Sequence, residues 1–380
     1  MLCLGGKPTG SGQKRAMRIV IVGAGVAGLS IGWRLRQAGA AVTVFERGQP
    51  ARAATWAAAG MIAVAGEMNA APTAESEFAH RSSLLWPGFA TEVEAASGLK
   101  VGYVRCGALM VAPVAVAGEA AGVEKLTALE ARAKEPMLTG DFANALWAPG
   151  EAQVDSRALG LALAEAFISS GGDLAPNEPV SRFDVQNGRA VAVVTPVRRL
   201  EADAFILAAG AWSSGIDGLP AEAVPPIRPV KGEMIALSPP SGAAIPRHIV
   251  WGNGVYLVPR AGRVLVGATS VEAGFDADVT DAATNWLRSS AISVMPALTT
   301  WNIAERWAGL RPASPDGLPL LGHTVVQGLY AATGQFRNGI LFAPAIAENL
   351  SRLVLEHAAQ IPAFDPRRFH KRHAAEARTS

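Results

Sequence analysis

The sequence has few of the residues that build disulfide frameworks, metal sites or membrane spans. Cysteine occurs only at positions 3 and 106 of the 380 residues, which excludes a disulfide framework and fits a reducing cytoplasm. The six histidines are scattered without the spacing of a metal site, so no bound metal is predicted. No uninterrupted apolar run reaches the roughly 18 residues that a helix needs to cross a bilayer. We therefore expect no transmembrane segment.

Charge is also sparse, with a formal net charge of +2 and lysine and arginine spread along the chain. The one basic cluster lies near the C-terminus, and we expect residues 366–380 to form a solvated tail rather than a nucleic-acid site. Residues 1–16 are rich in Gly, Lys and Ser and lack the apolar core of a secretory signal. We expect them to be a disordered extension or a cloning remnant, with Met17 as a plausible natural start.

The most informative feature present is a glycine motif between two apolar segments. The run 19–22 enters a G-x-G-x-x-G turn, an apolar helix follows, and a second apolar strand ends on Glu46. In such a unit Gly23 permits the tight turn, Gly25 lets backbone N–H groups approach a pyrophosphate, and Gly28 lets helix and strand pack closely. The diphosphate then lies at the positive end of the helix. Glu46 is placed to accept hydrogen bonds from an adenosine ribose and disfavours a 2′-phosphate, which indicates FAD or NAD. The alternative is an ordinary βαβ unit.

Further along the chain, apolar patterns indicate helices and short strands. The expected elements of the first half are a helix from residue 75 that Pro87 interrupts and a second helical stretch ending near 98, a strand over 101–111, a helix over 156–170 and a buried strand over 204–210. Those of the second half are short strands over 230–237, 255–259 and 264–268, a helix over 281–295, and a buried strand over 328–334 followed by a helix over 339–356.

These patterns predict a mixed α/β (α+β) fold, in which a Rossmann-like FAD-binding domain is interleaved with an antiparallel-sheet substrate domain. A dehydrogenase that uses NAD would place a second nucleotide-binding half directly after the first. Instead, glycine-terminated strands recur at 206–212 and 330–336, which suits an extended FAD. The expected FAD-binding domain comprises 17–90, 150–220 and 305–365, and the substrate-binding domain comprises 91–149 and 221–304.

Six motifs in one order carry a resemblance to a known family. They are AAAGM at 57–61, PVKGE at 229–233, YLVPR at 256–260, VGAT at 266–269, WAGLRP at 307–312, and FRNGIL at 336–341 followed by Ala343-Pro344. From about residue 18 to about residue 369 the chain resembles the D-amino-acid-oxidase-like flavoproteins, and most closely the glycine oxidases of thiamine biosynthesis. The resemblance implies the FAD fold of the D-amino-acid oxidase and glutathione-reductase type.

Together with the glycine motif and the glycine-terminated strands, the resemblance implies a set of FAD contacts. They are Gly23, Gly25, Val26, Ala27, Gly28, Glu46, Arg47, Thr55, Ala59, Gly60, Met61, Val180, Gly210, Gln335, Phe336, Arg337, Asn338, Gly339, Ile340 and Leu341. The similar sarcosine oxidases tether their flavin through a cysteine late in the chain. Neither cysteine of this chain lies there, so noncovalent FAD is expected.

The resemblance also implies three catalytic residues. Arg311 would clamp the substrate carboxylate, Tyr256 would add its hydroxyl, and Arg337 would lie beside the carboxylate. Amine oxidation by a flavin needs a positioned substrate rather than a protein nucleophile, and a guanidinium matches a carboxylate with two parallel hydrogen bonds. Taken alone, Arg311 could instead form a structural ion pair with Asp316, Tyr256 could be a half-buried sheet residue, and Arg337 could be an exposed arginine.

The chain departs from the family pattern at three positions that bear on the pocket. Ser270 replaces Met, Gly254 replaces a His found in one relative, and Gln335 replaces the usual His. Each change removes bulk or an ionisable ring. If Ser270 and Gly254 enlarge the pocket, D-alanine should compete well with glycine.

The expected activity is that of an FAD-dependent oxidase of glycine and other small amines, including sarcosine and small D-amino acids. Its products would be the oxo acid, ammonia and hydrogen peroxide, formed by hydride transfer from Cα to flavin N5 with O2 as the acceptor. A cytoplasmic homo-oligomer, a tetramer by resemblance, is expected. Two alternatives stay open: an FAD-dependent dehydrogenase subunit that passes electrons to a partner or a quinone, and a flavin-binding scaffold without turnover.

Overall fold

The computed structural model describes residues 15–67, 72–112 and 122–369. The extension expected over 1–16 and the tail expected over 366–380 lie largely outside these residues. Within them, no helix is long and apolar enough to cross a membrane.

A six-stranded sheet in the order β18-β19-β12-β1-β2-β8 forms the centre of the nucleotide-binding part. Its strands are β1 (Arg18–Val22), β2 (Ala41–Phe45), β8 (Asp173–Ala175), β12 (Ala204–Leu207), β18 (Leu320–His323) and β19 (Leu329–Thr333). All neighbouring pairs are parallel except β18 with β19. The near-continuous apolar runs of β1, β12 and β19 are typical of parallel strands that are covered on both faces.

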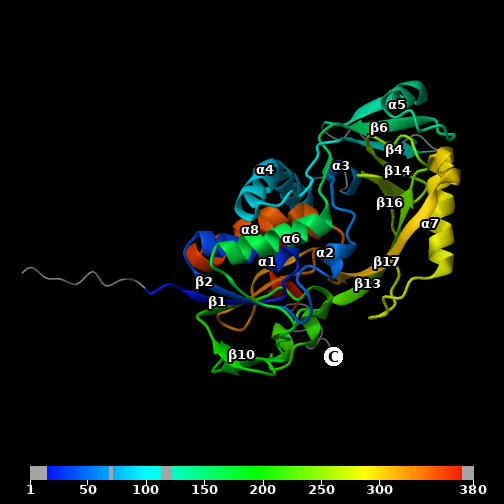
Figure 1. The fold of residues 1–380 in the computed structure, drawn as a ribbon. Helices are drawn as coiled ribbons and strands as arrows, with labels where there is room; N and C mark the ends of the chain where they lie inside the picture. Colours follow the sequence, from blue (N-terminus) through cyan, green and yellow to red (C-terminus); the bar gives the residue numbers. More distant parts are fainter. Residues whose placement is uncertain (1–14, 68–71, 113–121, 370–380) are drawn as a thin grey trace, which may run out of the picture.

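Helices cover one face of this sheet and a small antiparallel sheet covers the other (Figure 1). The helices are α1 (Val26–Gln37), α4 (Ala74–Ser97), α6 (Ser156–Ser169) and α8 (Gly339–Glu356). They enclose a core that includes the buried rings of Trp33, Trp86 and Phe342. The small sheet consists of β9 (Arg182–Gln186), β10 (Arg189–Val194) and β11 (Arg199–Glu201), and its Phe183 packs on Phe205 of β12. The expected helix over 156–170 and the strand over 204–210 are therefore confirmed, with small differences at their ends.

Helix α4 corrects the expectation that Pro87 interrupts the helix that starts near residue 75. The helix is 24 residues long, contains Pro87 in its interior and ends at Ser97, where Gly98 in the left-handed conformation caps it. A proline inside a helix costs about 3 kcal/mol, so other contacts must offset it. The buried Trp86 ring supplies one: its Nε1 donates to the carbonyl of Leu341 at 3.0 Å, and Ser82 Oγ donates to the same oxygen at 2.7 Å. Packing against α8 therefore outweighs the local preference.

The second large sheet has eight strands in the order β17-β13-β16-β15-β14-β4-β6-β5 and is antiparallel except between β14 and β4. Its strands are β4 (Ala108–Ala112), β5 (Glu124–Thr127), β6 (Asn144–Ala148), β13 (Arg228–Ser238), β14 (Ile249–Gly252), β15 (Val255–Arg260), β16 (Arg263–Gly267) and β17 (Asn302–Ala313). The strand expected over 101–111 thus begins only at Ala108. Helix α7 (Asp281–Val294) packs on the outer face, and α5 (Ala128–Lys134) lies beside β5 and β6 (Figure 1).

Short elements lie between the two large sheets. They are α2 (Ala54–Ala57), β3 (Met61–Ile62), α3 (Val64–Glu67), β7 (Ala152–Gln153) and the 3-10 helix η1 (Gly210–Gly215). Helix α2 contacts β17, and Trp307 Nε1 of that strand donates to the carbonyl of Ala57 at 3.0 Å. The domain border expected at residue 305 falls inside β17. The two sheets are thereby joined along the wall of the cavity described next.

Candidate active site and cofactor cavity

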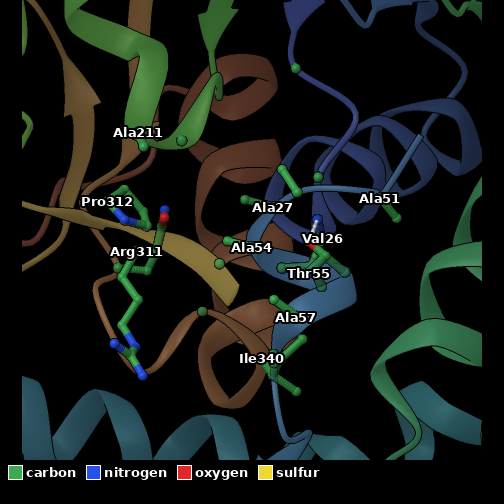
Figure 2. Close-up of a pocket in the computed structure, with 18 of the residues that line it drawn as sticks. Val26, Ala27, Ala51, Ala54, Thr55, Ala57, Ala211, Arg311, Pro312 and Ile340 are labelled. Carbon is green, nitrogen blue, oxygen red and sulfur yellow. Dashed lines mark hydrogen bonds between the residues drawn. The ribbon is translucent and has the colours of Figure 1, made fainter. Parts of the chain in front are cut away.

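A cavity of about 450 Å³ extends from the carboxyl ends of β1 and β2 to the inner face of the eight-stranded sheet. Figure 2 shows part of its lining. Every residue predicted to contact FAD lines it except Gly28. The three predicted catalytic residues, Arg311, Tyr256 and Arg337, also line it. Segments that lie far apart in the sequence therefore meet at one site, as the interleaved organisation requires.

The glycine motif forms the tight β1–α1 turn. Gly23 has φ +107°, a conformation that other residues rarely adopt, and a Cβ there would overlap the carbonyl of Ala208. A Cβ on Gly28 would overlap the carbonyl of Gly23 and would lie 3.4 Å from the Ile21 side chain. Gly28 therefore serves close packing of helix and strand, as predicted, while lying outside the cavity.

The N-terminus of α1 opens into the cavity as an anion site. Its N-cap is Gly25, which has no side chain to cap the helix, and its first turn carries no acidic residue. Thr55 Oγ1 accepts the N–H of Val26 at 2.9 Å and fixes α2 against this end (Figure 2). The remaining N–H groups of the first turn and the helix dipole favour a negatively charged group here.

Glu46 at the end of β2 is held by backbone donors. Its Oε2 accepts the N–H of Ala24 at 2.9 Å and its Oε1 accepts the N–H of Gly48 at 3.1 Å. Each carboxylate oxygen keeps lone pairs for a further donor such as a ribose hydroxyl. Beside it, the Arg47 guanidinium lies 3.4 Å from the ring centroid of Trp212, and burial lowers the pKa of Arg47. Trp212 lines the cavity and was missed from the sequence, where it is only one of nine tryptophans.

Gln335 supplies an observation that tests the fit to a flavin. Its side chain is 6% exposed and lines the cavity, and its Nε2 has no hydrogen-bond partner among the described residues. A buried donor without a partner is costly, and an acceptor atom of a bound flavin would remove that cost. With the anion site at α1 and the carboxylate of Glu46, the donor set fits FAD along the length of the cavity.

Arg311 of β17 is free to bind a carboxylate. Its Nη1 donates to the carbonyl of Thr269 at 3.0 Å, and no acidic side chain among the described residues lies within ion-pair distance of it. Asp316, its possible structural partner, instead pairs with Arg368 at 2.8 Å. Figure 2 shows the Arg311 side chain along the space whose far wall carries Val26, Thr55 and Ala57. The structural ion pair considered for Arg311 is therefore not formed.

Gly232 of β13 leaves the space that the Arg311 guanidinium occupies, since a Cβ on Gly232 would overlap that group. We expect Gly232→Ala to displace the end of a flexible side chain at little cost in unfolding free energy. Displacement of the Arg311 guanidinium should weaken the binding of a carboxylate ligand in the cavity by roughly tenfold or more. Titration with acetate, together with thermal unfolding, tests this, and an unchanged affinity in the variant would show that Arg311 does not bind the carboxylate.

Tyr256 and Arg337 lie at the same end of the cavity as Arg311. Tyr256 is buried rather than half-buried, its hydroxyl lies 3.8 Å from Met234 Sδ, and burial raises the pKa of Tyr256, which keeps the hydroxyl protonated. Arg337 is about half exposed, and its Nε lies 3.5 Å from Glu67 Oε2. The Arg337 side chain thus lines the cavity and also reaches solvent.

Arg260 of β15 ties the eight-stranded sheet to the cavity wall. Its guanidinium donates to Gln153, to the carbonyl of Ala59 and, at 2.6 Å, to the carbonyl of Val154. Burial lowers the pKa of Arg260 to about 10, so it stays charged at neutral pH. The YLVPR motif contained this residue, but nothing in the sequence alone indicated its partners.

Sequence reasoning missed two glutamates, one that lines the cavity and one that lies behind it. Glu67 lines the cavity at the end of α3, and burial raises its pKa. Glu151 accepts the N–H groups of Val64 and Ala65 at 3.0 and 2.9 Å, while its Oε2 is buried without a partner among the described residues. Burial, with a smaller contribution from the charge of Glu67, raises the pKa of Glu151 to about 7. The only available signal was the position of Glu67 shortly after the AAAGM motif.

The raised pKa of Glu151 predicts a pH-dependent stability. Because the folded protein binds this proton more tightly than the unfolded chain, the stabilisation is complete below the unfolded pKa and is lost as pH rises through about 7. Glu151→Gln removes the titration. We expect the unfolding free energy of the variant, minus that of the wild type, to increase between pH 5 and pH 8 by up to about 3 kcal/mol. Urea unfolding at several pH values measures this, and parallel pH curves for the two proteins would contradict it.

Of the three departures from the family pattern, only Gln335 lines the cavity. Ser270 is exposed, and a Cβ on Gly254 would lie 3.5 Å from Trp286 of α7. These two positions therefore give no support to the expectation of an enlarged substrate pocket. In the part of the chain that the structure describes, no group of three or more His, Cys, Asp or Glu side chains could hold a metal ion.

Comparison with known proteins agrees with this geometry. The family model described as FAD dependent oxidoreductase matches residues 18–353. Glycine oxidase from Geobacillus kaustophilus is 32% identical over 342 residues, covering 86% of this chain and 89% of that protein. A crystal structure of glycine oxidase from the same species has a TM-score of 0.85 at 30% identity, covering 93% of this chain and 99% of that one. The crystal structure of iminodiacetate oxidase from Chelativorans sp. BNC1 has a TM-score of 0.82 at 29% identity, covering 92% and 99%.

A longer relative is also similar. The bifunctional protein ThiO/ThiG from Trichormus variabilis is 36% identical over an alignment of 369 residues that covers 93% of this chain. The chain spans only 55% of that relative's length. The mixed α/β fold, the donor groups of the cavity and the family match all indicate the same cofactor, FAD. The chain belongs to the family of FAD dependent oxidoreductases that includes the glycine oxidases.

Proposed function

We propose that this protein is an oxidase that uses noncovalent FAD to deaminate glycine and other small amines, including sarcosine and small D-amino acids. The observation that carries the proposal is Arg311, a cavity arginine with no carboxylate partner among the described residues. A free guanidinium at the inner end of an FAD cavity is suited to the carboxylate of an amino acid. The names of the relatives support the same substrate class, since they include a glycine oxidase and an iminodiacetate oxidase.

The residues of the cavity account for orientation of the substrate. Arg311 holds the carboxylate. Tyr256, which burial keeps protonated, donates a hydrogen bond from its hydroxyl to the same group. Arg337 adds a second positive charge at this end. Bound FAD supplies the acceptor for the hydride equivalent that leaves Cα. The protein contributes position, because a substrate held in a reactive geometry avoids the entropy cost of a chance encounter.

Molecular oxygen is the proposed electron acceptor, with hydrogen peroxide as product and the imine hydrolysing to the oxo acid and ammonia. The alternative of a dehydrogenase subunit that passes electrons to a partner or quinone has no specific observation in its favour. Assembly as a homo-oligomer, the cytoplasmic location and a place in thiamine biosynthesis stay predictions from the sequence and its resemblance.

The test is a parallel measurement of oxygen uptake, peroxide and ammonia with glycine, sarcosine, D-alanine and iminodiacetate. For glycine we expect equal amounts of oxygen consumed and of peroxide and ammonia formed. Sarcosine should give methylamine in place of ammonia, which serves as an internal control for the position of bond cleavage. No oxygen uptake with any of the four, while an artificial dye is reduced in their presence, would favour the dehydrogenase.

A further inference from the structure

Glu67 is the one acid at the substrate end of the cavity among the described lining residues. The other acidic residue of the lining is Glu46, which the backbone N–H groups of Ala24 and Gly48 hold at the nucleotide end. The Glu67 side chain is 10% exposed and shares the cavity with Arg311 and Tyr256. An amino-acid substrate brings an ammonium as well as a carboxylate. An ammonium that loses its water needs an anionic or hydrogen-bonding partner.

The charges around Glu67 leave it available to such a partner. Arg337 approaches it at 3.5 Å with one nitrogen and is half exposed, which is a loose ion pair. The positive charges of Arg337 and Arg311 favour the carboxylate form, whereas burial and the nearby Glu75 of α4 disfavour it. Burial is the largest influence, so the pKa of Glu67 lies above its ordinary value. A carboxylate of this kind accepts a proton more readily at neutral pH than an exposed one does.

We propose that Glu67 binds the ammonium of the substrate and accepts one of its protons before oxidation. This inference rests on the proposed function. In the step, one N–H bond breaks, an O–H bond forms on Glu67, and the electron pair of the broken bond stays on nitrogen. That pair forms the C=N bond when the Cα hydrogen leaves with two electrons for FAD. Glu67 is thereby a catalytic residue, because it touches the reacting nitrogen.

Replacement of Glu67 by glutamine tests the proton transfer. We expect kcat/KM for glycine at pH 7 to fall by about 10²–10⁴-fold. The loss should reverse as pH is raised, because the free amine then forms without a base. In a plot of kcat/KM against pH, the ascending limb should therefore move to higher pH by more than one unit. A purely structural role would not be rescued by pH. Glu77→Gln is the control: it removes an exposed carboxylate from helix α4, and its ascending limb should coincide with that of the wild type.

Binding gives a readout that does not depend on turnover. Glycolate has the carboxylate of glycine but a hydroxyl in place of the ammonium. In calorimetric titration of the wild-type holoenzyme, glycolate should bind more tightly as pH falls through the pKa of Glu67, because the repulsion between carboxylates disappears. Glycine, measured by saturation of anaerobic flavin reduction, should bind more weakly over the same range. Glu67→Gln should abolish both trends, and the wild-type comparison holds even if that variant fails to fold.

The outcomes separate the two proposals. If glycine, sarcosine and D-alanine all fail to reduce the flavin of the wild-type protein, the proposed function is wrong. If glycine reduces it while glycine and glycolate respond to pH in the same direction, the role of Glu67 is overturned and the proposed function stands. An unchanged pH profile in a folded Glu67→Gln holoenzyme would overturn the role of Glu67 in the same way.

Discussion

Replacement of Arg311 by alanine is expected to lower kcat/KM for glycine by about one to two decades. The guanidinium has no acidic partner among the described residues, so its charge-assisted hydrogen bonds to the substrate carboxylate are the interaction lost. Such bonds contribute roughly 1.5–3 kcal/mol. The FAD content of the purified variant should match that of the wild type, because Arg311 lies at the substrate end. Peroxide formation over a range of glycine concentrations, with the flavin-to-protein absorbance ratio, measures both quantities.

Arg306 offers a matched control on the same strand. It is 44% exposed and pairs with Asp281, whose side chain is 88% exposed. Exposed pairs of this kind contribute about 0–1 kcal/mol. Arg306→Ala should therefore retain wild-type kcat/KM. Equal activities of Arg311→Ala and Arg306→Ala would show that another group holds the carboxylate.

Replacement of Gly23 by alanine is expected to yield protein that is largely free of FAD. Two costs combine at this residue: a φ of +107°, and overlap of the new Cβ with the carbonyl of Ala208, the residue that follows β12. The backbone strain alone costs about 1–3 kcal/mol. The overlap would push the β1–α1 turn away from the end of β12, where the FAD diphosphate is expected to bind. We expect FAD affinity to fall by at least about a hundredfold, measured by fluorescence titration of the deflavinated protein.

The variant Gly39→Ala separates the effect of backbone strain from the effect of steric overlap by the new Cβ. Gly39 follows α1 with a similar φ of +85°, but no heavy atom lies within 4 Å of a Cβ built there. It should lose about 1 kcal/mol of unfolding free energy and keep its FAD affinity. If the two variants bind FAD equally well, the overlap at Gly23 does not control the cofactor site.

The nucleotide half of the site could be predicted from the sequence because its signals are local. Gly23, Gly25, Gly28 and Glu46 lie within 24 residues, and their spacing follows from one strand, one turn and one helix. In the structure Gly23, Gly25 and Glu46 line the cavity, whereas Gly28 packs the helix against the strand outside it. The helix through Pro87 could not be predicted, because packing of Trp86 and Ser82 on α8 sets it, and those partners lie more than 250 residues away.

The substrate half could not be predicted from local patterns. Arg311, Tyr256 and Glu67 come from β17, β15 and α3, which meet only through the pairing of the eight-stranded sheet and its contact with α2. Motif resemblance supplied the first two residues. Glu67 became visible only when the cavity placed an acid beside two arginines. Burial, which raises its pKa and that of Glu151, has no signature in the sequence around either residue.

We propose that a small amino acid reduces FAD in this cavity and that oxygen then reoxidises it. Anaerobic mixing of the purified holoenzyme with glycine, followed by admission of air, tests this most directly. We predict loss of the flavin absorbance near 450 nm, its rapid return in air, and one peroxide for each flavin reduced. A flavin that glycine, sarcosine and D-alanine all leave oxidised would contradict the account, as would a reduced flavin that air reoxidises only slowly.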